Sequence, residues 1–138
     1  MAGADPSFPD DEVVATQILV VSDLERSRAW WVEVLGATPY RHYGGTSLVL
    51  SFAGIWILLV TGAPPTADKP TVTFGPPDNL DRISHAMTLR VADCRAVYAS
   101  LSARGASFLT PPHDWGAEIR AFLRDPDGHL LEISQTST

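Results

Sequence analysis

Residues 125–133 read Asp125-Pro126-Asp127-Gly128-His129-Leu130-Leu131-Glu132-Ile133, a tight turn followed by an alternating strand. Pro126 presets the first central position of a type I turn, Asp127 suits the second, and Gly128 accepts the positive φ of a bulge. The flanking runs, 118–124 and 129–135, therefore predict a β-hairpin. One face of this hairpin is apolar and suits packing under a helix. The other face has mixed polarity and carries Arg120, Phe122, Arg124, Leu130, Glu132 and Ser134.

The same order of elements occurs twice along the chain. Val21-Ser22-Asp23 recurs as Val91-Ala92-Asp93, 70 residues later, and each copy follows a run typical of a strand. Ser22 and Glu25 have the spacing of a capping box, which predicts a helix over residues 22–35, and Asp93 begins the second helix. A Gly ends each helix, and three strand-like runs follow it. This pattern indicates an internal duplication.

The repeat divides the chain into four segments. We expect a flexible leader over 1–12, a first βαβββ module over 13–61, a Pro- and Gly-rich linker over 62–83 and a second βαβββ module over 84–138. The fold class is α+β, with the two tandem modules arranged around a shared concave cleft. A sheet with a helix on one face needs a cover for the other, so this cleft is the default binding site.

Composition narrows the possible partners and location. The formal charge of −6, the pI near 5.0 and the dispersed basic residues argue against a nucleic-acid partner and an anionic membrane surface. No apolar run approaches the roughly 18 residues that a membrane span needs. Cys94 is the only cysteine, which excludes internal disulfides and Cys-rich metal sites. We therefore expect a cytoplasmic protein whose partner is a small molecule.

The two modules and their motifs resemble the vicinal oxygen chelate superfamily. The motifs are Val20-Val21-Ser22-Asp23-Leu24-Glu25 leading to Val34-Leu35-Gly36, and the turn and strand over 125–132. This superfamily includes glyoxalases, extradiol dioxygenases, fosfomycin-resistance thiol transferases and bleomycin-type binding proteins. The resemblance covers residues 13–135, implies a glyoxalase-like fold and leaves the reaction open. It also implies a homodimer, in which modules pair within one chain or exchange between two.

The resemblance implies three ligand positions for a divalent metal ion. The last-strand position falls on Glu132, which matches, whereas the two first-strand positions fall on Thr16 and Ala86. One carboxylate does not supply the three or more protein ligands that such a site needs, so we predict no cofactor. The alternative is a divalent metal such as Zn, Fe, Mn or Ni on Glu132, with Gln17 and His85 turned inward by strand bulges.

The aromatic residues on strands and loops predict the ligand site. Aromatic walls suit a flat, largely apolar ligand, because burial contributes ~25 cal/mol per Å² and ring stacking adds ~0.5–1.5 kcal/mol per pair. The other interpretation of these residues is ordinary core. For Glu132 the other interpretation is an ion pair with Arg120 or Arg124. The predicted ligand-binding residues are Trp115, Trp56, Phe122, Phe52, Arg120, Glu132, His113 and Tyr43.

These observations lead to one preferred function and two alternatives. The preferred function is a metal-free binding protein of the glyoxalase/bleomycin-resistance type that sequesters an apolar or aromatic ligand in the inter-module cleft. The first alternative is a metal-dependent lyase, isomerase or dioxygenase of the same superfamily that uses Glu132 with His85 and Gln17. The second is a metal-free enzyme with acid–base chemistry at His113 or Glu132.

Overall fold

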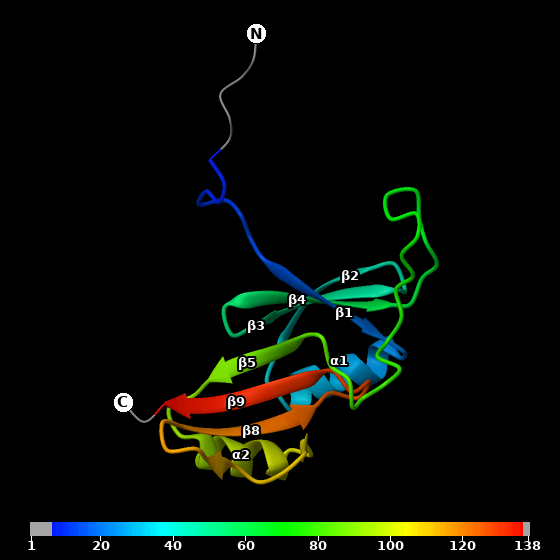
Figure 1. The fold of residues 1–138 in the computed structure, drawn as a ribbon. Helices are drawn as coiled ribbons and strands as arrows, with labels where there is room; N and C mark the ends of the chain where they lie inside the picture. The colour runs from blue at the N-terminus through cyan, green and yellow to red at the C-terminus, as the bar shows by residue number, and fades with distance from the viewer. Residues whose placement is uncertain (1–6, 137–138) are drawn as a thin grey trace.

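The computed structural model describes residues 7–136 as two βαβββ modules (Figure 1). The first module consists of β1 (Thr16–Val21), α1 (Leu24–Glu33), β2 (Thr38–Tyr43), β3 (Ser47–Phe52) and β4 (Ile55–Thr61). The second consists of β5 (Ala86–Arg90), α2 (Cys94–Ala103), β6 (Ser107–Phe108), β7 (His113–Asp114), β8 (Glu118–Arg124) and β9 (Leu130–Thr136).

Each module folds into one mixed sheet with a helix on one side. The strand order is β1-β4-β3-β2 in the first sheet and β5-β9-β8-β6 in the second, and β7 pairs with β8. In both sheets the first strand runs parallel to the last. The predicted α+β fold of two βαβββ modules is thus confirmed, and β7 is an additional short strand. The four segment boundaries stay a prediction, and part of the leader lies outside the described residues.

The two helices begin and end at the expected kinds of residue. The Asp93 carboxylate caps α2 by accepting the Ala96 N–H at 3.0 Å. In α1 the cap is Asp23, which accepts the Arg26 N–H at 3.0 Å, so the prediction that Ser22 caps this helix is wrong. Gly36, with φ +79°, follows α1 in the left-handed conformation expected after a helix.

The modules share one hydrophobic core. Trp31 of α1 is fully buried and lies edge-on to Phe52, with the ring centroids 5.5 Å apart. Cys94 is buried at the start of α2, and burial is the main cause that raises the pKa of its thiol. The buried core residues are Val21, Trp31, Ala37, Leu48, Leu50, Ile57, Leu59, Cys94, Leu101, Ile119, Ala121, Leu123, Leu131 and Ile133.

The β8–β9 turn joins the second module to the first. Asp127 accepts the Ser22 N–H at 3.0 Å and the Ser27 hydroxyl at 3.3 Å. The His129 Nε2 lies 2.8 Å from the Val20 carbonyl oxygen, to which it donates. Asp127 and His129 of the turn therefore make hydrogen bonds across the module junction.

Asp125 is buried at the base of the same turn. Its Oδ1 accepts the backbone N–H groups of Asp127 at 3.1 Å and His129 at 2.8 Å, which fixes the turn. Burial raises the pKa of Asp125, and His129 and the Trp31 indole N–H act in the opposite direction. Apart from the Trp31 indole, its second oxygen, Oδ2, meets no hydrogen-bond donor among residues 7–136.

Candidate functional site

The face of the second sheet that α2 leaves uncovered carries most of the predicted site. In the register of β5, β9 and β8, Thr88 lies beside Glu132, and Glu132 lies beside Phe122. One step along, Ser134 lies beside Arg120. Because paired residues of adjacent strands point to the same side, these side chains form one surface, which we call the open face of the second sheet. The face predicted for the hairpin is confirmed.

Glu132 is held by two neighbours on this surface. Its Oε1 accepts a hydrogen bond from the Thr88 hydroxyl. The Arg120 Nε lies 3.9 Å from its Oε2, a loose ion pair. Only 16% of the Glu132 side chain is exposed. The carboxylate is thus mostly covered and fixed in place, and its Thr88 partner is a residue that the sequence interpretation missed.

Arg120 is the centre of the cluster on the open face. Its guanidinium carbon lies 5.2 Å from the centroid of the Trp115 ring and 5.7 Å from that of Phe122. Its Nη1 donates to the Glu118 Oε1 at 3.1 Å. These contacts position a cation against two aromatic rings, an arrangement worth ~0.5–2 kcal/mol per ring. Glu118 is a second residue that the sequence interpretation missed, although its alternation with Arg120 along β8 signals a shared face.

His113 joins this cluster through the short strand β7. Its register partner on β8 is Arg120, and the centroid of its ring lies 4.4 Å from that of Trp115. The structure therefore brings together five of the predicted ligand-binding residues, His113, Trp115, Arg120, Phe122 and Glu132. Trp115 is 62% exposed, so an apolar surface remains for a ligand.

Two other predicted residues form a separate cluster on the first sheet. Trp56 lies edge-on to Tyr40 with the ring centroids 5.0 Å apart, and Arg41 lies over the rings of Tyr40 and Tyr43. No ring contact, ion pair or hydrogen bond joins this cluster to the open face of the second sheet within residues 7–136. Phe52 points the other way and packs against the core, so we leave it out of the proposed site.

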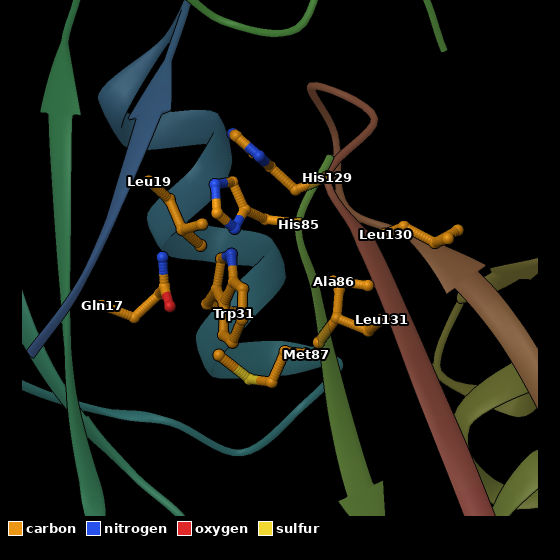
Figure 2. A pocket seen from close by; sticks show the side chains of 9 residues that line it. All are labelled: Gln17, Leu19, Trp31, His85, Ala86, Met87, His129, Leu130 and Leu131. Atoms are coloured by element: carbon orange, nitrogen blue, oxygen red, sulfur yellow. The ribbon is translucent and has the colours of Figure 1, made fainter. Parts of the chain in front are cut away.

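The alternative metal ligands do not meet. Gln17 and His85 line a cavity between β1 and β5, together with Trp31 of α1 and His129 (Figure 2). Glu132 is not among the residues that line this cavity. Within residues 7–136, no group of three or more His, Cys, Asp or Glu side chains could hold a metal ion. The strand bulges that would bring Gln17 and His85 to Glu132 are absent from β1 and β5, whose registers run without a shift.

Comparison with known proteins supplies the family. The family model of the Glyoxalase/Bleomycin resistance protein/Dioxygenase superfamily matches residues 12–133. The chain belongs to this superfamily. It is also 29% identical over 115 residues to a glutathione transferase, FosA, from Serratia marcescens, a match that covers 83% of this chain and 74% of FosA.

Solved structures share the fold of this superfamily member. The crystal structure of a glyoxalase/bleomycin resistance protein/dioxygenase from Nocardioides has a TM-score of 0.75 at 21% identity, covering 96% of this chain and 87% of that one. A variant of the fosfomycin-resistance protein FosX from Listeria monocytogenes has a TM-score of 0.66 at 17% identity, covering 88% of each chain. That FosX structure contains Mn(II) and 1S,2S-dihydroxypropylphosphonic acid.

These relatives correct the prediction about cofactors. We predicted no cofactor from Thr16 and Ala86, but the FosX complex with Mn(II) points to a divalent metal rather than to none. Of the three ligand positions, only Glu132 carries a metal-binding side chain, and Thr88 and Arg120 already contact it. The described side chains around Glu132 therefore do not complete a divalent-metal site by themselves.

The helices also bear on the membrane question. Neither α1 nor α2, nor any other helix in the described part of the chain, is long and apolar enough to cross a bilayer. The cytoplasmic location stays a prediction.

Proposed function

We propose that this superfamily member binds a small, largely apolar molecule with a planar portion on the open face of the second sheet. The observation that carries the proposal is the Arg120 guanidinium held against Trp115 and Phe122, with Glu132 alongside. The rings supply apolar walls, and the charged groups orient polar atoms of the ligand. The Trp56 and Tyr43 cluster on the first sheet supplies a second aromatic surface.

Sequestration of such a ligand needs no chemical step. Trp115 is the most exposed aromatic side chain of the open-face cluster, and it lies in a loop beside a fixed cation. A planar ligand stacked on its indole would bury apolar area that now faces water, at ~25 cal/mol per Å². Because Glu118 and Glu132 already flank Arg120, a neutral ligand suits this surface better than a strongly anionic one.

Replacement of Trp115 tests the binding proposal. We expect Trp115→Ala to weaken binding of a planar aromatic ligand about tenfold or more, because the variant loses one stacking partner and its apolar area. The measurement is a tryptophan-fluorescence titration with a panel of planar aromatic natural products, repeated by calorimetry for the variant. Trp30→Phe, on α1, is the matched control and should bind like the wild type. Saturable binding of equal strength in all three proteins would contradict this site.

Replacement of Glu132 tests whether the chain binds a divalent metal ion. Because the relatives point to a divalent ion, we expect wild-type protein to lower the free Mn(II) signal in electron paramagnetic resonance saturably, and Glu132→Gln to lose this effect. This substitution removes the carboxylate of Glu132, the residue that matches a metal-ligand position of the family. Glu118→Gln, on the same face, serves as the control. If Glu132→Gln takes up Mn(II) as the wild type does, the ion binds elsewhere on the chain.

An enzyme is the second candidate, favoured by the 29% identity to a protein named as a glutathione transferase. In that case Glu132 would hold the metal, and the aromatic cluster would position the substrate. Incubation with fosfomycin, glutathione and Mn(II), followed by ³¹P NMR, separates the candidates. A new phosphonate product that Glu132→Gln does not form supports the enzyme. Ligand binding by Trp115 without turnover supports the binding protein.

The homodimer also stays a proposal. Ile18 on β1 and Ile55 on β4 are apolar and exposed in the single chain, and they suit contact with a second copy. Sedimentation equilibrium at several protein concentrations measures the oligomeric state directly.

A further inference from the structure

The two acidic residues of the open-face cluster are fully engaged by neighbours on the same face. The Glu118 oxygens accept hydrogen bonds from Arg120 Nη1 at 3.1 Å and from the Ser134 hydroxyl at 3.0 Å. The Glu132 Oε1 accepts from the Thr88 hydroxyl, and its Oε2 lies 3.9 Å from Arg120 Nε. All four carboxylate oxygens therefore have a partner, and the cluster leaves none of them for a further cation.

Arg90 is a cation on the same face that this cluster does not neutralise. In the register of the sheet, Arg90 of β5 lies beside Ser134 of β9, which lies beside Arg120 of β8. Because residues paired across neighbouring strands point to the same side, Arg90 shares the open face with the cluster. Arg90 is exposed, and its side chain makes no ion pair, hydrogen bond or ring contact within residues 7–136. Its charge is therefore available to a ligand.

Arg90 and the exposed Trp115 ring lie on opposite sides of Arg120 along one row across the sheet. The row runs from Arg90 through Ser134 and Arg120 to His113 of β7, whose ring lies against Trp115. Two strand spacings separate the backbones of Arg90 and Arg120, a distance of roughly 10 Å. Ser134 is fully buried, so it does not obstruct the surface between the two arginines. A planar ring packed against Trp115 and Arg120 can therefore direct a substituent along the row toward Arg90.

The chemistry of Arg90 indicates which substituent suits this end of the row. A guanidinium presents paired N–H donors in one plane, and these match the two oxygens of a carboxylate. Two carboxylates already face the single guanidinium of Arg120, so their charge repels a further anion there. Arg124, another arginine of this face, already donates to the Gly128 carbonyl oxygen at 3.3 Å. A ligand carboxylate is therefore best placed at Arg90.

We propose that the ligand of the open face is an aromatic monocarboxylate and that Arg90 is the residue that selects its acid group. This inference rests on the proposed function, in which Trp115 and Arg120 hold the planar part of the ligand. It adds the chemical class of the ligand and its direction on the sheet, with the rings over β8 and the carboxylate over β5. Arg90 thus decides specificity, while the aromatic side chains supply most of the apolar contact.

Two probes of matched shape test the charge preference. Naphthalene-2-carboxylate and naphthalene-2-carboxamide share the bicyclic ring and a planar substituent, and they differ in charge. We expect the carboxylate to bind the wild-type chain about fivefold or more tightly than the carboxamide, measured by calorimetry at low ionic strength. Arg90→Gln should bind both probes with equal affinity, and its affinity for the carboxamide should match that of the wild type. Arg90→Lys, which keeps the charge without the planar guanidinium, should retain part of the preference.

Two further variants separate this inference from the proposed function. Arg95→Gln removes the same charge from an exposed position on α2, away from the open face, and should keep the wild-type preference for the carboxylate. Trp115→Ala should weaken the binding of both probes alike. Equal affinity of the wild type for both probes, or a preference that persists in Arg90→Gln, would overturn the inference and leave the planar-ligand site in place. If neither probe binds, or if Trp115→Ala binds both as the wild type does, the proposed function fails and this inference fails with it.

Discussion

Trp31→Ala is expected to lower the free energy of unfolding by about 3–5 kcal/mol, the usual cost of deleting a large aromatic side chain from a core. Trp31 is fully buried, packs edge-on to Phe52 and lines the cavity that also contains Gln17 and His85. Its loss enlarges a space that already exists, so the surroundings have little freedom to collapse into it. Thermal unfolding followed by circular dichroism should show a melting temperature lower by roughly 10–15 °C.

Trp31→Phe separates packing from hydrogen bonding in this result. Phenylalanine keeps most of the buried ring and removes the Nε1–H, which makes no well-aligned hydrogen bond in the described chain, so we expect stability within about 1 kcal/mol of the wild type. Trp30→Ala on the same helix, where the side chain is only partly buried, should cost less than Trp31→Ala. Equal losses for Trp30→Ala and Trp31→Ala would show that Trp31 is not the main packing residue of α1.

Local chemistry accounts for the part of the fold that could be predicted from sequence. Strand alternation placed Arg120, Phe122 and Glu132 on one face, because a period of two leaves a side chain only two directions. The helix ends at Gly36 and Gly105 follow from backbone conformations that glycine adopts easily. These features depend on neighbours within a few residues, which a sequence displays directly.

The residues that sequence reasoning misplaced depend on distant partners. Phe52 is an aromatic residue on a strand, which is typical of a cleft wall. It packs in the core instead, because its ring contacts Trp31 of α1. Ser22 and Glu25 have the spacing of a capping box, but the Ser22 N–H donates a hydrogen bond to Asp127. The side chain of Asp23 caps the helix instead. His113 reaches the site only because β7 pairs with β8. None of these pairings leaves a local pattern in a single sequence.

Asp127→Ala is expected to cost about 2–3 kcal/mol of stability because it removes the contact between the β8–β9 turn and the first module. The Asp127 side chain is 4% exposed and accepts hydrogen bonds from the Ser22 N–H and the Ser27 hydroxyl. Alanine leaves both donors without an acceptor, and the fully buried Ser27 hydroxyl cannot turn to water instead. Urea unfolding measures the loss, and hydrogen exchange at Ser22 locates it.

The cause of this loss can be distinguished from a general weakening of α1. Asp23→Ala removes the helix cap and should cost about 1 kcal/mol, while the Ser22 amide stays protected by Asp127. Asp127→Asn keeps an acceptor oxygen and should recover much of the stability lost in Asp127→Ala. Since β9 begins directly after this turn and carries Glu132, a loosened turn should also weaken ligand binding at the open face. A stable Asp127→Ala with a protected Ser22 amide would mean that the His129 bond to Val20 holds the modules together without Asp127.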